Sequence, residues 1–479
     1  MTTDLEAILQ RAREAQRQWA ARPLSVRLQP VHTLRARLAS APVPLADIVA
    51  REIGKTRTET IGAEILPVAE ACAFLLDRAP KLLAPRRETL RGVLPFAGSA
   101  IIQHQPWGVV ATLVPWNYPL FLCAVPVLNA LVAGNAAVMK ASPRAKETVA
   151  AFGRWLVDAG FPPDLVPVLD SSDDMGRKLS ASPLVDRIIF TGSSKTGRAI
   201  LKAAAENLVP ATVELSGCDA VFVLRDANLT LAADAVTFGL RINAGRTCIC
   251  PRRLFVEEPV AEPFLTALKD RTNRLKLQTP MDPQTLREAD ELAQRLTAAG
   301  AIALNERREG DAEKALVVSG DAKVMEATQG NFVPALVATK VKNIDEALSL
   351  EAQSPYALGA SVFSRDVKAA VGLASRLRAG IIGINECVAY GGEAALPFGG
   401  RDESGYGVRG GEEGLMEMTR PQALAIARGS FRPHHVAETE AEAMLLALLR
   451  ARHSGTFFGR LKGLFDYGRE AIAWRPPKH

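Results

Sequence analysis

A cysteine and a glutamate, each set among small residues, have the chemistry for nucleophilic catalysis. Cys248 ends the stretch Asn243-Ala-Gly-Arg-Thr-Cys248, and Glu214 lies upstream in Thr212-Val-Glu214-Leu-Ser-Gly217. A thiolate attacks a carbonyl carbon and forms a thioester that hydrolyses readily, while a carboxylate can activate the water for that hydrolysis. The small residues beside them permit tight turns and close backbone approaches. Because a cysteine taken alone is more often a small buried hydrophobe, the interpretation depends on the surrounding sequence.

The surrounding sequence consists of several blocks in a fixed order. They read Pro106-Trp-Gly-Val-Val-Ala-Thr-Leu-Val-Pro115-Trp116-Asn117-Tyr-Pro119, Val138-Met-Lys140-Ala-Ser-Pro143, Phe190-Thr191-Gly192-Ser193-Ser-Lys-Thr-Gly197, the glutamate and cysteine stretches, and Pro397-Phe-Gly-Gly-Arg-Asp-Glu-Ser-Gly405-Tyr-Gly407. The whole set resembles the aldehyde dehydrogenase superfamily, and the resemblance runs from about residue 50 to about residue 431. Several independent blocks in one order are far more specific than a single short pattern.

The resemblance implies three catalytic residues for the oxidation of an aldehyde to a carboxylic acid through a thiohemiacetal and a thioester. Cys248 would be the nucleophile, and the Asn117 amide with the Cys248 backbone N–H would stabilise the oxyanion. Glu214 would be the general base for hydrolysis. Relatives that acylate coenzyme A generally lack this glutamate, so its presence favours release of the acid. Cys250 is interpreted as a packing residue rather than as a thiol that links to Cys248.

The resemblance also implies a nicotinamide dinucleotide, NAD or NADP, as the cofactor. Lys140 follows an apolar run, where its ammonium can reach ribose hydroxyls. Thr191, Gly192 and Ser193 open a helix whose backbone N–H groups can bind a pyrophosphate. Pro143 stands where NAD-preferring relatives often carry a ribose-binding glutamate, which favours acceptance of NADP as well. The predicted cofactor-binding residues are Pro115, Trp116, Lys140, Thr191, Gly192 and Ser193.

Two departures from the family pattern leave alternatives open. Arg246 replaces the usual glutamine two residues before the nucleophile, and it either lowers the pKa of the thiol or forms a salt bridge elsewhere. The Glu-x-Phe-Gly-Pro segment that holds the nicotinamide ribose is missing, since residues 330–342 run directly into Asn343. The alternatives to a full dehydrogenase are a catalytically weakened structural or interaction subunit and a cysteine esterase that needs no nicotinamide.

The hydrophobic pattern predicts an α/β protein. Residues 4–85 are expected to be mostly helical, and residues 87–105 to form a hairpin. Strands at 109–114, 136–140, 165–169, 187–190 and 212–215 alternate with helices such as 145–159, which is typical of a doubly wound, Rossmann-like sheet. A second α/β unit is expected from Ala220 to about Asn385. The predicted domains are a dinucleotide-binding domain (1–86 and 106–216), a catalytic domain (217–395), an oligomerisation hairpin and strand (87–105 and 418–432) and a C-terminal extension (433–479).

The composition narrows the choice of partners. The net charge of +6 over 479 residues is modest and comes without an arginine-rich or aromatic-interleaved module, which argues against nucleic-acid binding. The six cysteines are scattered, without the spacing of a disulfide framework or a metal site. We therefore expect a cytoplasmic enzyme with no metal, which the resemblance makes a homodimer or homotetramer.

The C-terminal extension leaves the family pattern. Residues 438–452 are a predicted helix, followed by a segment rich in Phe, Leu and Tyr, and from Arg450 to Lys478 basic residues outnumber acidic ones seven to two. Such a segment suits peripheral contact with a membrane, although it is too interrupted to span one. The alternative, which we favour from the sequence, is packing over a partner subunit or the substrate entrance. Contact with lipid would make a long-chain or isoprenoid aldehyde the more natural substrate.

Overall fold

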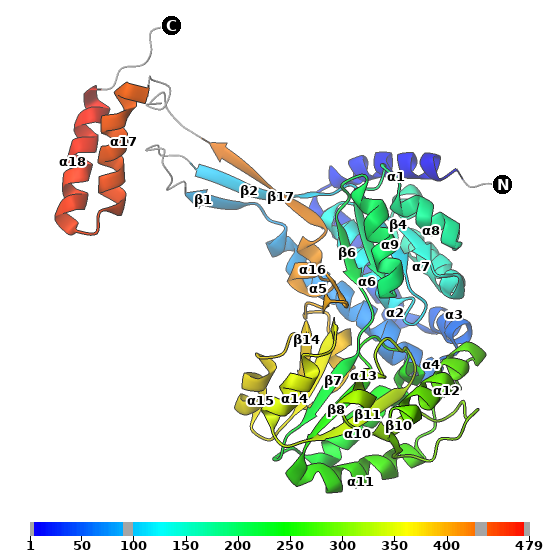
Figure 1. The fold of residues 1–479 in the computed structure, drawn as a ribbon. Coiled ribbons are helices and arrows are strands. Elements are labelled where there is room, and N and C mark those ends of the chain that lie inside the picture. Colours follow the sequence, from blue (N-terminus) through cyan, green and yellow to red (C-terminus); the bar gives the residue numbers. More distant parts are fainter. Residues whose placement is uncertain (1–3, 90–98, 427–437, 474–479) are drawn as a thin grey trace. The chain divides into compact units, whose positions relative to one another are not determined.

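The structure, a computed structural model, describes residues 4–89, 99–426 and 438–473 (Figure 1). The chain divides into two compact units. The first comprises Met1–Leu82 and Pro106–Arg420, and the second comprises Leu83–Gln105 and Pro421–His479. The predicted α/β class is confirmed, because the first unit contains two largely parallel sheets with helices between their strands.

The N-terminal segment is helical, as predicted. Asp4 caps the first helix by accepting a hydrogen bond from the Ala7 backbone N–H, and Gly54 ends the third in the left-handed conformation, at φ +76°. Apolar residues at three- and four-residue spacing face inward, with Leu9, Val31 and Leu34 fully buried. The helices are α1 (Leu5–Ala20), α2 (Leu24–Ser40), α3 (Val43–Ile53), α4 (Arg57–Thr60), the π-helix η1 (Ile61–Ile65) and α5 (Leu66–Leu82).

A five-stranded sheet follows, in the order β16-β6-β5-β3-β4. The four strands β6, β5, β3 and β4 are parallel, and β16 pairs antiparallel with β6. Every residue of β3 and β4 is buried, as expected for parallel strands that are covered on both faces. The strands are β3 (Val109–Val114), β4 (Ala136–Ala141), β5 (Arg187–Thr191), β6 (Ala211–Glu214) and β16 (Gly405–Tyr406). The connecting helices are α6 (Phe121–Ala133), α7 (Lys146–Ala159), α8 (Asp173–Ser180) and α9 (Ser194–Ala205), with short helices at η2 (Pro143–Ala145) and η3 (Pro163–Leu165).

The predicted strand at residues 165–169 is wrong. Leu165 ends η3, and the segment beyond it contributes only an isolated bridge between Val168 and Met139. Proline explains the error, because Pro163 favours the first turn of a helix and Pro167 lacks the N–H that a ladder needs. The other four strands predicted for this sheet and the helix at 145–159 are confirmed within one or two residues.

The second sheet has seven strands in the order β14-β13-β7-β8-β11-β10-β9. Neighbouring strands are parallel except β9 with β10. Residues of β7 alternate between two cores: Val221 packs with helices α10 and α11, while Phe222 packs with α12 to α15. The strands are β7 (Asp219–Val223), β8 (Pro251–Glu257), β9 (Ile302–Ala303), β10 (Leu316–Ser319), β11 (Ala335–Val341), β13 (Gly359–Phe363) and β14 (Ile381–Ile384). The helices are α10 (Leu229–Arg241), α11 (Glu258–Arg274), α12 (Pro283–Ala298), α13 (Ala322–Glu326), α14 (Ile344–Glu351) and α15 (Val367–Ala374).

Short elements lie between the strands of the second sheet and after its last strand, from which the chain returns to the first sheet. They are the turns η4 (Ile242–Gly245) and η5 (Ala389–Gly392), the strands β12 (Tyr356–Ala357) and β15 (Arg401–Asp402), and the helix α16 (Gly411–Met416).

The second unit contains a three-stranded sheet and a pair of helices. The predicted hairpin is confirmed as β1 (Arg86–Thr89) paired antiparallel with β2 (Ser99–Pro106), and β17 (Thr419–Ile426) lies on the other side of β2. Residues 427–432 of the strand predicted at 418–432 lie outside the described residues. Helix α17 (Glu438–His453) confirms the predicted C-terminal helix. The aromatic segment that follows forms a second helix that was not predicted, α18 (Phe457–Ala473), and the two helices pack against each other. Within the described segments, no helix is long and apolar enough to cross a membrane.

Candidate active site

The residues predicted from the first sheet's motifs gather at one edge of that sheet. Pro115, Trp116 and Asn117 follow β3, Lys140 lies near the end of β4, Thr191 ends β5 and Glu214 ends β6. Thr191 is paired directly with Glu214 in the ladder. In parallel α/β sheets, ligands bind outside the carboxyl ends of the strands, so the fold brings these residues to the expected place.

Cys248 approaches this edge at the end of a strained turn. Asn243, Ala244 and Gly245 have φ values of +49°, +51° and +68°. Two consecutive non-glycine residues in this conformation cost about 1–3 kcal/mol each, and such strain persists only where the surroundings enforce it. Here Asn117 holds the turn in this conformation through two hydrogen bonds. The Asn243 amide donates to the Asn117 carbonyl at 2.8 Å, and the Asn117 amide donates to the Arg246 carbonyl at 3.2 Å.

The Cys248 thiol is half-buried and lines a cavity. Burial raises its pKa well above the ordinary value; the negative charge of Glu214 and a hydrogen bond to that carboxylate raise it further, while the charge of Arg409 lowers it. The resting cysteine is therefore a thiol, which needs a base before it can attack a carbonyl. A β-carbon at Gly217 would lie 2.4 Å from the Cys248 carbonyl oxygen, so the absence of a side chain at Gly217 lets the glutamate stretch lie against the Cys248 backbone.

Glu214 forms a buried ion pair with Arg409, which the sequence analysis missed. The Arg409 Nε donates to Glu214 Oε2 at 2.8 Å, and the two side chains are 7% and 4% exposed. The Arg409 guanidinium lies over the Phe398 ring at 4.2 Å and over the Phe121 ring at 5.1 Å. The second carboxylate oxygen, Oε1, is buried without a hydrogen-bond partner among the described residues. An unpaired acceptor beside a thiol is suited to take a proton or to bind a water molecule.

Of the two alternatives for Arg246, the structure shows the salt bridge, although the side chain is buried rather than directed outward. Its Nη1 lies 3.7 Å from Asp282, its Nε donates to the Asn243 carbonyl at 3.0 Å, and its guanidinium lies 5.5 Å from the centre of the Trp116 ring. The arginine whose charge acts on the Cys248 thiol is instead Arg409. Cys250 is fully buried in the core of the second sheet, in agreement with its predicted packing role.

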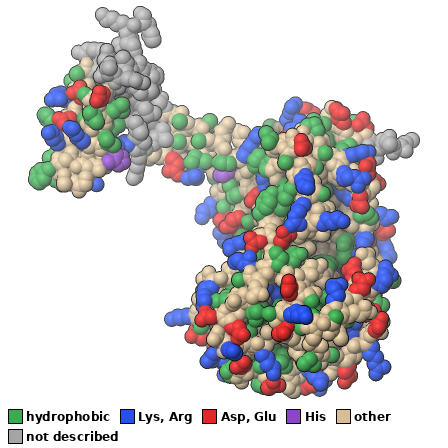
Figure 2. Space-filling view, viewed as in Figure 1, with side chains coloured by type: hydrophobic (Ala, Val, Ile, Leu, Met, Phe, Trp, Pro, Cys, Tyr) green, Lys and Arg blue, Asp and Glu red, His purple; other side chains and the backbone are tan. Residues whose placement is uncertain are grey.

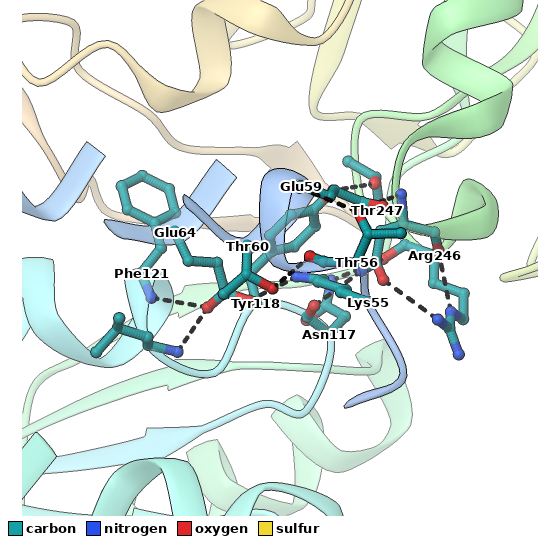
Figure 3. Close-up of polar contacts among 12 residues, drawn as sticks. Lys55, Thr56, Glu59, Thr60, Glu64, Asn117, Tyr118, Phe121, Arg246 and Thr247 are labelled. Carbon is teal, nitrogen blue, oxygen red and sulfur yellow. Dashed lines mark hydrogen bonds and ion pairs between the residues drawn. The ribbon is translucent and has the colours of Figure 1, made fainter. Parts of the chain in front are cut away.

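A buried polar network supports the nucleophile from the N-terminal helices (Figure 3). Lys55 and Glu64 form an ion pair at 2.6 Å whose side chains are both 0% exposed. Glu64 Oε2 accepts from the Leu120 backbone N–H at 2.8 Å and so caps α6. The Lys55 ammonium lies 3.8 Å from the centre of the Tyr118 ring, and the Tyr118 hydroxyl is hydrogen-bonded to Thr247 at 2.6 Å. This chain of contacts ends one residue before Cys248.

The predicted cofactor residues present donors that suit a dinucleotide. Ser193 caps α9 by accepting from the Thr196 N–H at 3.2 Å, so the free backbone N–H groups of this helix start beside Gly192. Lys140 is 7% exposed, and burial lowers its pKa while Asp173 and Asp170 oppose that effect. The Trp116 ring is covered by the Arg144 guanidinium at 3.6 Å. An ammonium, a helix N-terminus and a cationic aromatic surface fit ribose hydroxyls and phosphates.

The cavity at Cys248 has a volume of about 830 Å³, which is near the upper end for small-molecule sites. Its charged lining residues are four glutamates and two arginines, Glu59, Glu70, Glu386, Glu393, Arg241 and Arg409. The larger part of its wall is apolar: Leu66, Pro67, Phe121, Leu122, Phe238, Ile242, Ile249, Val388, Tyr390, Leu396 and Phe398. A large apolar cavity with an excess of acidic groups suits a bulky apolar ligand better than an anionic one.

Comparison with known proteins gives one consistent result. The model of the aldehyde dehydrogenase family matches residues 1–424. A 4,4'-diapolycopene aldehyde oxidase from Methylomonas sp is 32% identical over 434 residues, which cover 86% of this chain and 80% of that protein. A protein of Mycobacterium ulcerans provisionally named NADP(+) succinate-semialdehyde dehydrogenase 2 is 32% identical over 442 residues, with coverages of 89% and 85%. The crystal structure of an NADP-dependent glyceraldehyde-3-phosphate dehydrogenase from Bacillus halodurans with NADP matches with a TM-score of 0.82, 28% identity and coverages of 88% and 91%.

Proposed function

The chain belongs to the aldehyde dehydrogenase family, and from that premise we propose the roles of its residues and the kind of aldehyde it accepts. The activity itself is the oxidation of an aldehyde to a carboxylic acid with NAD or NADP. The reading as a catalytically weakened structural subunit is not favoured, because the relatives across almost the whole chain are named as enzymes.

We assign the chemical steps to Cys248, Glu214 and Asn117. Glu214 takes the proton of the Cys248 thiol, and the sulfur attacks the aldehyde carbon. The Asn117 amide, which carries a second N–H besides the one that donates to Arg246, and the Cys248 backbone N–H stabilise the oxyanion. A bound NAD or NADP would supply the hydride acceptor that conversion of the thiohemiacetal into a thioester requires. Glu214 releases the thiol proton to solvent and then orients and deprotonates a water molecule at Oε1. Hydrolysis of the thioester releases the acid and frees the Cys248 sulfur.

We propose that the cofactor lies along the carboxyl edge of the five-stranded sheet. Lys140 would bind ribose hydroxyls, Thr191, Gly192 and Ser193 would meet the pyrophosphate at the start of α9, and Pro115 and Trp116 would lie beside the dinucleotide. The dinucleotide-binding domain would be residues 1–86 and 106–216, and the catalytic domain residues 217–395. Phe332, whose ring centre is 6.1 Å from that of Trp116, comes from the segment that replaces the missing Glu-x-Phe-Gly-Pro motif and would border the same site.

We propose a bulky apolar aldehyde as the substrate, and the wall of the cavity at Cys248 is the observation that carries this proposal. The two curated relatives are named for very different aldehydes, one long and apolar and the other an anionic semialdehyde. Four glutamates against two arginines would repel a carboxylate, whereas the apolar wall would bury a hydrocarbon chain.

The test is production of NADH or NADPH from a graded panel of aldehydes. The expected kcat/KM rises from short to long unbranched and polyene aldehydes and is low for succinate semialdehyde, and Cys248→Ala abolishes the signal. A preference for succinate semialdehyde would overturn the substrate proposal but leave the dehydrogenase assignment intact. Dinucleotide reduction that persists in Cys248→Ala would overturn the catalytic assignment.

Assembly and location complete the proposal. We propose a homodimer or homotetramer built through the β1–β2 hairpin and β17, and a cytoplasmic enzyme whose residues 433–479 touch the inner face of the membrane. The mass in solution, measured by light scattering, tests the first of these statements.

A further inference from the structure

The two C-terminal helices pack against each other through small residues. Gly463 of α18 is buried, and a β-carbon there would lie 2.1 Å from the Ala451 backbone nitrogen of α17. On α17 the buried residues are Met444, Ala447 and Ala451, which recur at helical spacing. The contact between the helices therefore uses little of their apolar surface.

Most of the large apolar residues of both helices are exposed instead. On α18 they are Phe457 (75% exposed), Phe458 (80%), Leu461 (54%), Leu464 (59%), Phe465 (74%) and Ile472 (82%). At 3.6 residues per turn these side chains fall within an arc of about 120°, on the side of the helix opposite Gly463. On α17, Leu445, Leu446 and Leu449 are 49%, 44% and 57% exposed and lie opposite Met444 and Ala447. We call the exposed apolar residues of the two helices the apolar stripes.

Basic residues border these stripes. By the same helical geometry, Lys462 and Arg469 lie along one edge of the α18 stripe and Arg460 along the other. Arg450 and Arg452 flank the leucines of α17. Figure 2 shows apolar and basic side chains together on the visible face of these helices. A soluble helical hairpin normally buries its apolar face between its helices, so this one has its amphipathic pattern inverted.

We propose that α18 is a peripheral anchor, braced by α17, that inserts its apolar stripe into the interface of an anionic lipid bilayer. Aromatic and aliphatic side chains on one face of α18, with lysine and arginine at its margins, are the pattern of interfacial helices. The basic margins complement phosphate headgroups and select lipid over a neutral apolar surface. The anchor lies beyond residue 424, where the family match ends, so it is a property of this chain rather than of the shared catalytic fold.

The experiment is flotation of the full-length protein with vesicles of phosphatidylcholine, with and without phosphatidylglycerol. The stripe variant is Phe458→Glu with Phe465→Glu, and the margin variant is Lys462→Gln with Arg469→Gln. The matched control, Val367→Glu with Val371→Glu, puts the same two charges on exposed apolar residues of α15, which are 54% and 50% exposed. We expect wild type and control to float with the anionic vesicles, the stripe variant to lose binding by at least about tenfold, and the margin variant to lose it on anionic vesicles.

Equal flotation of wild type and the stripe variant would overturn the proposal, as would failure of wild type to float. A lower mass of the stripe variant by sedimentation without lipid would also overturn it, because a second copy of the chain would then cover the stripes. Circular dichroism and unchanged oxidation of a short water-soluble aldehyde establish that the variants are folded. Flotation needs no turnover, so this proposal, which deepens the membrane contact proposed above, and the proposed enzymatic activity fail separately.

Discussion

Replacing Arg409 by methionine removes the charge that faces Glu214 and keeps an apolar stem against Phe398 and Phe121. In wild type the guanidinium and the carboxylate are 2.8 Å apart at their closest atoms and almost fully buried. Two unit charges about 4 Å apart attract by about 4 kcal/mol at an effective dielectric constant of 20. Removal of one member of a buried pair costs about 3–5 kcal/mol, because the remaining charge has no compensation. Arg409→Met should therefore lower the melting temperature sharply.

The double variant Arg409→Met with Glu214→Gln separates lost pairing from lost packing. Glutamine is neutral, so the buried uncompensated charge disappears, and the double variant should be more stable than Arg409→Met alone. Arg409→Lys keeps the charge but loses the planar contact with Phe398, and its stability should lie between those of wild type and Arg409→Met. Thermal unfolding of wild type, Arg409→Met, Glu214→Gln and the double variant gives the coupling between the two side chains.

The pKa of the Cys248 thiol is a second measurement, and it would not change if Arg409 had only a structural role. Arg409 lowers the pKa of Cys248 and Glu214 raises it, so the pKa should move up in Arg409→Met and down in Glu214→Gln. The pH dependence of Cys248 alkylation by iodoacetamide measures both shifts. We expect kcat at neutral pH to fall by about 10²-fold or more in either variant, since each disables the base. The double variant should be no slower than the worse single one, because residues that act as a unit are not additive.

Two results would refute this reasoning. If the double variant were less stable than Arg409→Met by the full effect of Glu214→Gln, the ion pair would not be coupled in the folded protein. If the alkylation profile of Arg409→Met matched that of wild type, Arg409 would not act on the nucleophile.

Three further substitutions test other parts of the site. Gly217→Ala places a β-carbon 2.4 Å from the Cys248 carbonyl oxygen and should lower kcat by about 10²-fold, whereas Gly372→Ala, with no atom within 4 Å, should leave kcat unchanged in the same NADH assay. Burial raises the pKa of Asp219 to about 7, so the native carboxyl holds its proton up to that pH and wild-type stability declines between about pH 4 and pH 7. The stabilising effect of Asp219→Asn should therefore grow over this range to about 4 kcal/mol. Melting temperatures measured against pH test this, and a difference between the two proteins that does not vary with pH would contradict the assignment. Pro143→Glu restores a carboxylate near the adenosine ribose and should lower kcat/KM for NADP relative to NAD by about tenfold; an unchanged ratio would place the 2′-phosphate elsewhere.

The edge of the first sheet could be predicted because each of its residues is tied to a local pattern. Lys140, Thr191 and Glu214 follow or end short apolar runs that became parallel strands, and the carboxyl ends of such strands necessarily meet. The same local reasoning failed at residues 165–169, where the apolar composition predicted a strand although Pro163 and Pro167 disfavour one. Proline decides there because it removes a ladder donor whatever its neighbours favour.

The contacts that tune the site could not be predicted, because they join distant stretches. Arg409 is 195 residues from Glu214, and the two meet only because β16 pairs antiparallel with β6 at the register Gly405–Glu214. Lys55 and Glu64 are charged residues in a helical region, which on the sequence alone are expected at the surface. Their complete burial depends on α6, whose N-terminus needs an acceptor that no local side chain supplies.

The cavity and the C-terminal helices give two independent reasons to expect an apolar substrate. An aldehyde that fills the apolar wall at Cys248 partitions into lipid, so its concentration in water is small and its concentration in a bilayer is large. An enzyme bound to that bilayer meets its substrate at the higher concentration without any change in the catalytic residues. Loss of the apolar stripes should therefore lower the rate on vesicle-borne aldehydes and not on soluble ones, whereas a change in the cavity wall would alter the order of preference in both settings. The C-terminal helices set the concentration of aldehyde that the enzyme meets, and the cavity wall sets which aldehyde it oxidises. Each feature can be removed by substitution while the other is kept.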